Sequence, residues 1–272
     1  MAIEQSLFAD APGPTNKVPA TIHDLLICAG PGETGRDSPV KKLRSYILGN
    51  TSTAEYQRLD LMSKILDPWT RSLIAGLGLR EGWHCLELGG GNGSMTEWLC
   101  EKVGASGSVT SVDIEPKLIA LVPAQNLVVR QADARVANLP VGPFDLVMCR
   151  AMLHQISEHA QGVLGKMATA VKPGGWLFAC EPDFNLVRTC EPKAWAKTWD
   201  GILKWGKSQG VNWLIGRRLP GMVKALGLGS EESYQVHDLL TDARYVWHGS
   251  RNFVDLNPSV LPAHIFQVHS IG

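Results

Sequence analysis

Four glycines within five positions dominate the stretch CLELGGGNGSMTEWL, residues 85–99. An apolar run with a single acid, Glu87, precedes them, and a segment compatible with a helix follows. Glycine adopts positive φ without strain and lets a ligand approach the backbone closely. A strand, a glycine turn and a helix in this order are typical of the ligand-binding edge of a doubly wound parallel sheet. The stretch therefore predicts an α/β fold with a nucleotide site at this turn.

Short apolar runs alternate with helix-compatible segments through the rest of the chain. Strands are expected at 84–89, 108–114, 126–132, 144–150, 175–181, 232–240 and 264–272. Two helices are expected before the glycine turn, one starting near Thr53 behind the capping box of Ser52 and Glu55, the other opened by Asp67 and Pro68. The pattern predicts a Rossmann-like, doubly wound sheet of seven mostly parallel strands, with a helical N-terminal arm and a helical lid insert.

Four segments are expected from these changes of pattern. They are an N-terminal arm or cap at 1–50, a nucleotide-binding Rossmann-like core at 51–185, a helical lid or substrate insert at 186–229, and C-terminal strands at 230–272 that complete the core sheet.

The composition of the chain limits the kinds of partner that it is expected to bind. Lys plus Arg (26) equal Asp plus Glu (26), so no net field favours nucleic acid or an anionic membrane. The six cysteines form no CxxC pair, and no basic leader or apolar run of membrane-spanning length is present. A cytoplasmic protein with reduced thiols and a small-molecule partner is expected, and a homo-oligomer is compatible with the sequence.

The glycine spacing distinguishes two kinds of nucleotide site. A dinucleotide fingerprint counted from Gly89 has Ser94 where its third glycine belongs. The pattern E-x-G-x-G-x-G fits fully at Glu87, Gly89, Gly91 and Gly93 and resembles motif I of the class I S-adenosylmethionine-dependent methyltransferases.

Later motifs extend this resemblance from about Tyr46 onward. Asp113 ends a predicted strand where the family's acid accepts the ribose hydroxyls, and Asp133 lies where the motif III acid meets the adenine amino group. FDLVMCRAMLHQI and VKPGGWLFACEPD resemble motif IV and the fifth strand, and the flanking segments resemble the small-molecule branch. The resemblance implies S-adenosylmethionine as cofactor, with contacts from Tyr46, Arg58, Glu87, Gly89, Gly91, Gly93, Asp113, Ile114, Asp133, Ala134, Cys149 and Arg150. Tyr46 and Arg58 would reach its methionine carboxylate.

Two further residues are the catalytic candidates. His154, just after the fourth predicted strand, is the first candidate for a general base, because an imidazole titrates near neutral pH. The alternative is that it only caps or lines the cofactor pocket. Glu181, ending the fifth predicted strand, could orient an acceptor or neutralise a cationic one, or else serve as a capping or solvent-facing acid. Trp195 and Trp199 share a helix face and form either an aromatic wall for a flat acceptor or plain core.

Some methyltransferase classes do not fit. The motif IV segment lacks the [D/N]-P-P-[Y/F] sequence that is typical of enzymes methylating nucleic-acid bases. Metal-dependent catechol-type enzymes carry acids just after the fourth strand, whereas here no acid follows Cys149 until Glu158, so no metal is expected.

The resemblance implies methyl transfer to a small hydrophobic or aromatic acceptor, in specialised (natural-product) biosynthesis, with O-, N- and C-methylation left open. Two alternatives are kept. One is an enzyme of the same fold that uses S-adenosylmethionine without methyl transfer, for cyclisation or rearrangement, and the other is a non-catalytic nucleotide-binding module.

Overall fold

A computed structural model describes residues 53–189, 191, 193–228, 230–236 and 263–270. Its centre is a seven-stranded sheet in the order β3-β2-β1-β4-β5-β7-β6. Strands β1 to β5 pair in parallel, and β7 is antiparallel to both β5 and β6. The strands are β1 His84–Leu88, β2 Ser108–Asp113, β3 Leu127–Gln131, β4 Phe144–Arg150, β5 Val171–Asp183, β6 Ser230–Val236 and β7 Ala263–Ser270. The predicted α/β class and parallel core are confirmed.

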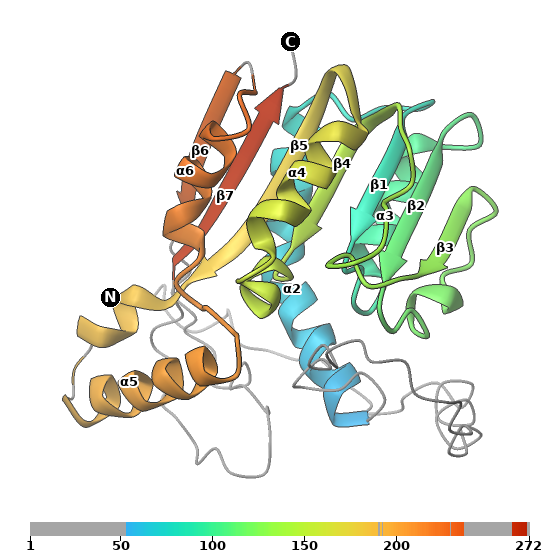
Figure 1. The fold of residues 1–272 in the computed structure, drawn as a ribbon. Coiled ribbons are helices and arrows are strands. Elements are labelled where there is room, and N and C mark those ends of the chain that lie inside the picture. Colours follow the sequence, from blue (N-terminus) through green and yellow to red (C-terminus); the bar gives the residue numbers. More distant parts are fainter. Residues whose placement is uncertain (1–52, 190, 192, 229, 237–262, 271–272) are drawn as a thin grey trace, which may run out of the picture.

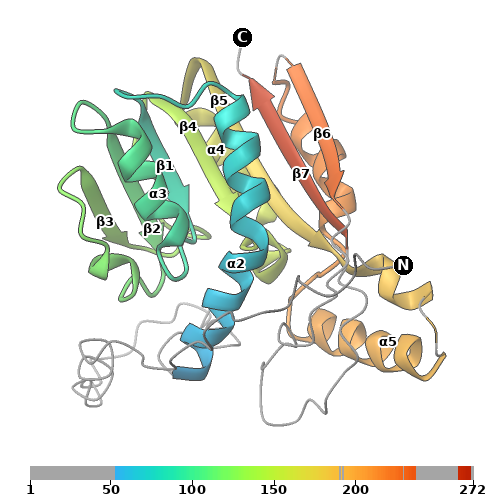
Figure 2. The same ribbon diagram turned by 180° about the vertical axis from the view of Figure 1, so that it is seen from behind.

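Helices cover both faces of the sheet. The helices are α2 Thr53–Gly76, α3 Ser94–Val103, α4 Ala160–Ala170, α5 Lys193–Ser208 and α6 Leu219–Lys224. Helices α4 and α6 share one hydrophobic cluster with the sheet, while α2 and α3 share a second cluster on the opposite face (Figures 1 and 2). Helix α5 lies beyond the carboxyl end of β5, away from both layers. Because helices cover both faces of the sheet, a ligand can reach it at the carboxyl ends of the parallel strands.

The segment before the glycine turn is one helix, so the expected break at Asp67 and Pro68 is wrong. Helix α2 begins at Thr53, as predicted, but continues through Pro68 to Gly76. Its buried face crosses the proline without interruption, because Leu66, Thr70 and Ile74 are 4%, 0% and 0% exposed. Proline removes only one intrahelical donor, and this continuous burial offsets the loss.

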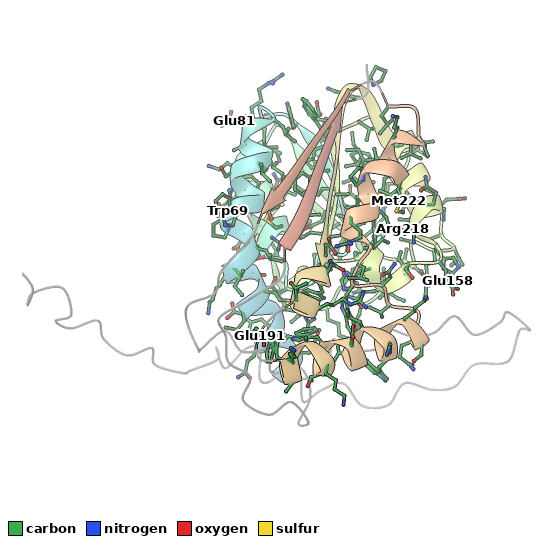
Figure 3. The ribbon with its side chains drawn as sticks, turned by 90° about the vertical axis from the view of Figure 1, so that its left-hand side faces the viewer. Trp69, Glu81, Glu158, Glu191, Arg218 and Met222 are labelled. Carbon is green, nitrogen blue, oxygen red and sulfur yellow. The ribbon has the colours of Figure 1, made fainter. Side chains whose placement is uncertain are left out.

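The outer side of α2 faces solvent. Trp69 is 48% exposed and lies on the side of α2 away from the sheet (Figure 3). Asp67 does not cap a helix and instead pairs with arginines, as described below.

Strand β5 is longer than expected. It starts at Val171, directly after α4, and runs for 13 residues. Val171 pairs with Phe144 and Trp176 pairs with Leu146, so the intervening residues of β5 bulge out of register. The Pro-Gly-Gly sequence at 173–175 lies within this bulge, so β5 begins four residues before the strand predicted at 175–181.

Four cysteines lie in the described part, and all four have free, buried thiols: Cys85, Cys100, Cys149 and Cys180. Burial raises the pKa of each of them, to about 12 for Cys100. They therefore act as small hydrophobic residues of the core, as the sequence predicted.

Candidate active site

The glycine turn between β1 and α3 needs glycine at three of its positions. Gly89, Gly91 and Gly93 have φ of 75°, 59° and 84°, which L-residues with a side chain rarely adopt. Among the described residues, a Cβ added at Gly91 would meet only Leu59 of α2, at 3.6 Å, so this side of the turn has room for a ligand. A Cβ at Gly89 would come within 2.9 Å of the Met152 side chain. The turn thus fits a cofactor at Gly91 and packs against the segment after β4 at Gly89.

Glu87 lies beneath the turn. Its side chain is buried, and its Oε2 accepts hydrogen bonds from the hydroxyls of Thr96 and Ser111, the latter at 3.1 Å. Burial raises the pKa of Glu87 above its ordinary value, although these hydroxyls and the nearby Arg150 oppose the shift. Glu87 was expected to contact the cofactor, and the structure places it where it ties β1 to α3 and β2.

Glu87→Gln tests this supporting role. Both hydroxyls can still donate to an amide oxygen, and burying a neutral amide costs less free energy than burying an ionised carboxylate. Because the folded-state pKa is raised, ionised Glu87 lowers stability as the pH rises through that pKa. The variant should therefore match or exceed the wild type in thermal stability at neutral pH, and this advantage should shrink in acid.

The control for this substitution is Glu97→Gln, which changes an exposed acid of the same helix α3. The affinity for S-adenosylhomocysteine should stay within about threefold in both variants. A tenfold loss confined to Glu87→Gln would instead make Glu87 a direct ligand of the cofactor.

Asp113 faces the glycine turn from the end of β2. Its Oδ1 accepts the backbone N–H of Glu115 at 2.8 Å, and its Oδ2 accepts a long hydrogen bond of 3.4 Å from the N–H of Gly91. Oδ2 therefore keeps acceptor capacity for a ligand. Burial raises the pKa of Asp113, against the effect of the backbone hydrogen bonds. The next residue, Ile114, is 39% exposed beside it.

Asp133, after β3, is already paired. Nε and Nη2 of Arg135 donate to both carboxylate oxygens at 2.7–3.0 Å, and the backbone N–H of Arg135 donates to Oδ1 at 2.9 Å. Burial alone would raise the pKa of Asp133, but Arg135 holds it below the ordinary value. A contact with adenine at this position, with Ala134 beside it, remains a prediction, and it requires Arg135 to share the carboxylate.

Lys166 of α4 holds the loop that carries Asp133. Its ammonium group donates to the carbonyl oxygens of Ala134, Arg135 and Ala137 at 3.0, 3.3 and 2.8 Å. The sequence analysis missed both Lys166 and Arg135. Arg135 lies two residues from a predicted site residue, which was a usable signal, whereas nothing in the sequence pairs Lys166 with a loop some thirty residues earlier.

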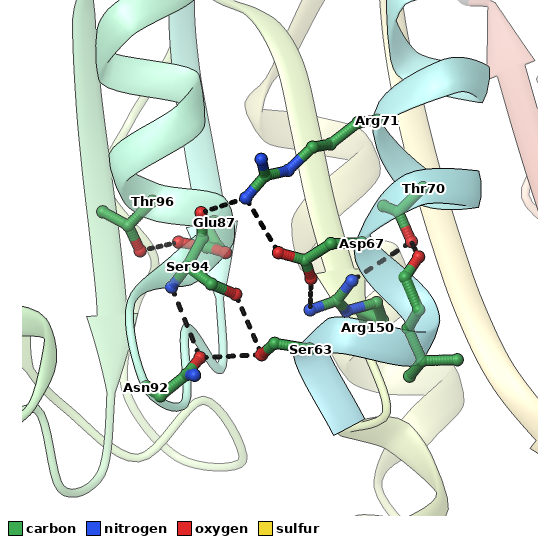
Figure 4. A network of polar contacts seen from close by, with 10 residues as sticks. Ser63, Asp67, Thr70, Arg71, Glu87, Asn92, Ser94, Thr96 and Arg150 are labelled. Atoms are coloured by element: carbon green, nitrogen blue, oxygen red, sulfur yellow. Dashed lines mark hydrogen bonds and ion pairs between the residues drawn. The ribbon is translucent and has the colours of Figure 1, made fainter. Parts of the chain in front are cut away.

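Arg150 joins the end of β4 to α2. Its Nη2 forms an ion pair with Asp67 Oδ1 at 2.8 Å, and its Nη1 donates to Thr70 Oγ1 at 3.2 Å (Figure 4). Asp67 also accepts a hydrogen bond from Arg71 at 2.8 Å. The side chain of Cys149, the other site residue predicted on β4, is fully buried, so only its backbone can face a ligand. Arg150 thus fixes α2 against the sheet edge.

A second set of contacts joins α2 to the glycine turn itself. Ser63 donates to Asn92 Oδ1 at 3.0 Å and accepts a hydrogen bond from the Ser94 hydroxyl at 2.9 Å (Figure 4). Arg71 donates to the carbonyl oxygen of Ser94 at 3.1 Å. Helix α2 is therefore a wall of the candidate cofactor site.

Of the two upstream residues predicted to bind the cofactor, the structure describes Arg58 and leaves Tyr46 outside the described residues. Arg58, in the first turns of α2, is buried and makes two hydrogen bonds to Glu55, at 2.8 and 2.6 Å. Its Nη1 also contacts the Met62 sulfur at 2.7 Å. The contact of both residues with the methionine carboxylate stays a prediction.

The structure brings His154 and Glu181 together. The carboxylate of Glu181 lies 2.8 Å from His154 Nδ1, and both side chains are buried. His154 belongs to the short 3-10 helix Leu153–Ile156, which follows the carboxyl end of β4. The alternative of a solvent-facing Glu181 is wrong, since its side chain is 0% exposed. Two candidates expected to act separately thus form one pair.

Aromatic residues beyond this pair form a small core. Trp199 of α5 packs against Phe184 and Trp195, with ring centroids 5.4 and 6.1 Å apart, and Phe184 packs in turn against Trp213 at 6.2 Å. Trp199 is 8% exposed, so it belongs to this core, while Trp195 is only partly buried. Asn212 donates its backbone N–H to the carbonyl oxygen of His154 at 2.7 Å. The segment 193–215, which contains α5 and is called the α5 cap below, is therefore joined directly to His154 through Asn212.

Gly206 of α5 lets the α5 cap close on Trp213. A Cβ at Gly206 would lie 2.3–2.9 Å from three ring atoms of Trp213, so Gly206→Ala should push the ring away and destabilise the α5 cap by about 1–3 kcal/mol. Gly201→Ala on the same helix meets nothing within 4 Å and should stabilise it by about 0.5–1 kcal/mol. Thermal unfolding monitored by tryptophan fluorescence checks both, and equal effects would contradict this packing.

A comparison with protein families identifies the chain. A family model described as "Methyltransferase domain" matches residues 56–232, more than half of the sequence. The chain belongs to this family of S-adenosylmethionine-dependent methyltransferases. The match contains the glycine turn, Asp113, Asp133, His154 and Glu181, and so confirms the predicted resemblance on the residues that carried it.

Curated relatives of the methyltransferase region are C-methyltransferases. The ubiquinone/menaquinone biosynthesis C-methyltransferase UbiE of Hahella chejuensis is 30% identical over 155 residues, which cover 53% of this chain and 62% of that protein. The same enzyme of Francisella philomiragia is 28% identical over 137 residues, covering 46% and 54%. The chain thus spans between half and two thirds of the length of these relatives.

The C-terminal part resembles a different protein. A model described as "GLGE, C-terminal" matches residues 221–268. The alpha-1,4-glucan:maltose-1-phosphate maltosyltransferase of Methylacidiphilum infernorum is 47% identical over 49 residues, which are 18% of this chain and 7% of that enzyme. The sequence analysis did not foresee this second resemblance. Strands β6 and β7 therefore pair with a methyltransferase sheet while most of their sequence lies outside the methyltransferase match.

Solved structures share the fold. An S-adenosylmethionine-dependent methyltransferase of Methanosarcina mazei has a TM-score of 0.53 at 16% identity, covering 73% of this chain and 97% of that one. A methyltransferase of Aquifex aeolicus has a TM-score of 0.52 at 16% identity, covering 80% and 97%. At these identities the likeness concerns the fold alone.

The described residues contain neither a candidate metal-binding cluster nor a candidate membrane span. None of their His, Cys, Asp and Glu side chains gather in threes or more around a point that could hold a metal ion. None of their helices is both long and apolar enough to cross a membrane.

Proposed function

We propose that this protein transfers the methyl group of S-adenosylmethionine to a small hydrophobic or aromatic acceptor. The observation that carries the proposal is the approach of Asp113 to Gly91, an acid with spare acceptor capacity facing an open glycine turn at the carboxyl edge of the sheet. A neutral net charge supports a small acceptor over nucleic acid or a membrane, and the buried thiols support a reducing, cytoplasmic setting.

Each part of the site has a proposed role toward the cofactor. Asp113 would accept the ribose hydroxyls, and the backbone of Gly89 and Gly91 would line the path of the methionine moiety. The loop at Asp133 and Ala134 would border the adenine, and Arg150 supplies positive charge at the same edge. When bound, S-adenosylmethionine supplies an already activated methyl group, so the protein mainly orients the acceptor, excludes water and removes one proton.

His154 is the residue proposed to remove that proton. It is the histidine that follows β4 at the carboxyl edge of the sheet, and a neutral imidazole has one ring nitrogen with a lone pair that can accept a proton. The partly buried Trp195 of α5, a segment joined to His154 through the backbone of Asn212, supports a flat hydrophobic acceptor. The two curated relatives are named C-methyltransferases, which supports a carbon acceptor, while a hydroxyl acceptor is supported by the proposed base alone; specialised metabolism is the proposed setting.

Turnover on a panel of phenols, indoles and amines tests this function. Purified full-length protein is incubated with S-adenosylmethionine and each acceptor, and S-adenosylhomocysteine is measured. Release that requires one acceptor class supports the proposal. Cofactor binding with an altered acceptor but no S-adenosylhomocysteine would instead favour an enzyme that uses the cofactor without methyl transfer.

A further inference from the structure

The carboxylate of Glu181 accepts four hydrogen bonds inside the protein. Oε1 accepts the backbone N–H groups of Met152 and Leu153 at 2.9 and 2.7 Å. Oε2 accepts the backbone N–H of His154 at 3.0 Å and lies 2.8 Å from the Nδ1 of the same residue. A carboxylate offers about four acceptor sites, so no capacity is left for a substrate. Glu181 therefore acts on the turn after β4 and does not touch the acceptor.

These contacts determine which nitrogen of His154 carries the proton. The carboxylate can only accept, so Nδ1 must be the donor and the neutral ring must carry its proton there. Nε2 then presents a lone pair, and no described residue makes a hydrogen bond to it. The backbone of His154 is fixed from both sides, by Glu181 and by the N–H of Asn212 in the α5 cap. The ring is thus prepared to accept a proton at Nε2.

We propose that Glu181 is a positioning residue that holds His154 as the Nδ1–H tautomer, so that Nε2 takes the proton of a weakly acidic hydroxyl acceptor of the phenol class. This inference rests on the proposed methyl transfer. In the step, the acceptor O–H bond breaks and its proton passes to Nε2. An O–CH3 bond forms as the S–CH3 bond breaks, leaving a neutral thioether and an imidazolium paired with Glu181.

A phenol fits this arrangement better than an amine does. A phenol has a pKa near 10, as tyrosine has, and becomes a strong nucleophile only when a base removes its proton. A neutral amine already carries the attacking lone pair and needs no base before attack. The imidazolium formed with a phenol is stabilised by the buried carboxylate that holds it.

The tautomer is measured directly by ¹⁵N NMR of full-length protein labelled at its eight histidines, at pH 8. The His154 signals are identified by their loss in His154→Gln. The expected result is a protonated Nδ1 and an unprotonated Nε2 for His154. A protonated Nε2 in the wild type would overturn the inference, and this result needs no variant of Glu181.

Kinetics of Glu181→Gln give the second readout. In Glu181→Gln the amide oxygen can keep the backbone N–H groups of Met152 and Leu153, which turns the NH2 group toward Nδ1 of His154. Nδ1 must then accept, so the Nδ1–H tautomer should be lost and kcat should fall about 10²–10⁴-fold. The KM for S-adenosylmethionine should stay within about threefold. The control is His84→Gln, since His84 is exposed at the opposite edge of the sheet and contacts a hydroxyl, and its kcat should not change.

Three outcomes separate this inference from the proposed function. Unchanged kcat in Glu181→Gln, or turnover of amines but not phenols by the wild type, would overturn the inference while methyl transfer stands. Failure of the wild type to bind S-adenosylhomocysteine would overturn the proposed function itself. If Glu181→Gln does not fold, the tautomer in the wild type decides.

Discussion

His154→Ala should lower kcat about 10²–10⁴-fold while the affinity for S-adenosylmethionine changes less than about threefold. The ring lies at the end of β4 and is held by Glu181, so its removal should affect proton transfer and not the glycine turn or Asp113. Turnover with the best acceptor of the panel and calorimetry with S-adenosylhomocysteine measure the two quantities separately.

A structural cost accompanies this substitution. Alanine removes the side-chain donor to the buried Glu181 carboxylate, which should lower the free energy of unfolding by about 1–3 kcal/mol. Thermal unfolding of the variant therefore has to confirm that it is folded at the assay temperature, with His84→Ala as the matched control. Equal losses of kcat and of cofactor affinity would make His154 a residue of the cofactor pocket, the alternative that its sequence position left open.

Asp113→Ala should weaken binding of S-adenosylmethionine and S-adenosylhomocysteine by about 1–3 kcal/mol, because a charge-assisted contact to the ribose is lost. Calorimetry at pH 7.5 measures this effect. Glu115→Gln is the control, since Glu115 lies two residues away and pairs with Lys117 at the surface. Wild-type affinity in Asp113→Ala would remove the ribose role.

The same residue predicts a dependence of affinity on pH. Burial raises the pKa of Asp113, so its protonation begins at a higher pH than that of an ordinary aspartate. The ionised form is the better acceptor, so the affinity for S-adenosylhomocysteine should fall as the pH is lowered toward that pKa. Asp113→Asn should show a weaker affinity without this acid loss. A wild-type profile as flat as that of the variant would contradict the raised pKa.

Much of the fold follows from local sequence patterns. The strands β1 to β4 lie within a residue or two of their predicted bounds, because short apolar runs that end at turn residues are typical of strands. The pattern failed at Pro68, where a proline preceded by an aspartate has the sequence of a helix start. Burial of Leu66, Thr70 and Ile74 on one continuous face outweighs that local signal, and such burial depends on the finished fold.

The candidate site was predictable where it depends on backbone geometry. Positive φ at Gly89, Gly91 and Gly93 and an acid at the end of β2 follow from residue type and spacing. Side-chain partners were not predictable, because they come from distant segments. Glu181 follows His154 by 27 residues and Lys166 follows its carbonyl partners by about 30, and only strand order brings them together. The C-terminal match to a maltosyltransferase segment could not be predicted from hydrophobic periodicity, because the pattern of these residues predicts strands of any β-containing protein.

Calorimetric titration of the full-length protein with S-adenosylmethionine and S-adenosylhomocysteine tests the central claim most directly. The account predicts saturable one-site binding of both ligands and a clear loss in Asp113→Ala. Absence of binding by the folded wild type would contradict the assignment of the glycine turn and Asp113 as a cofactor site, and with it the proposed methyl transfer.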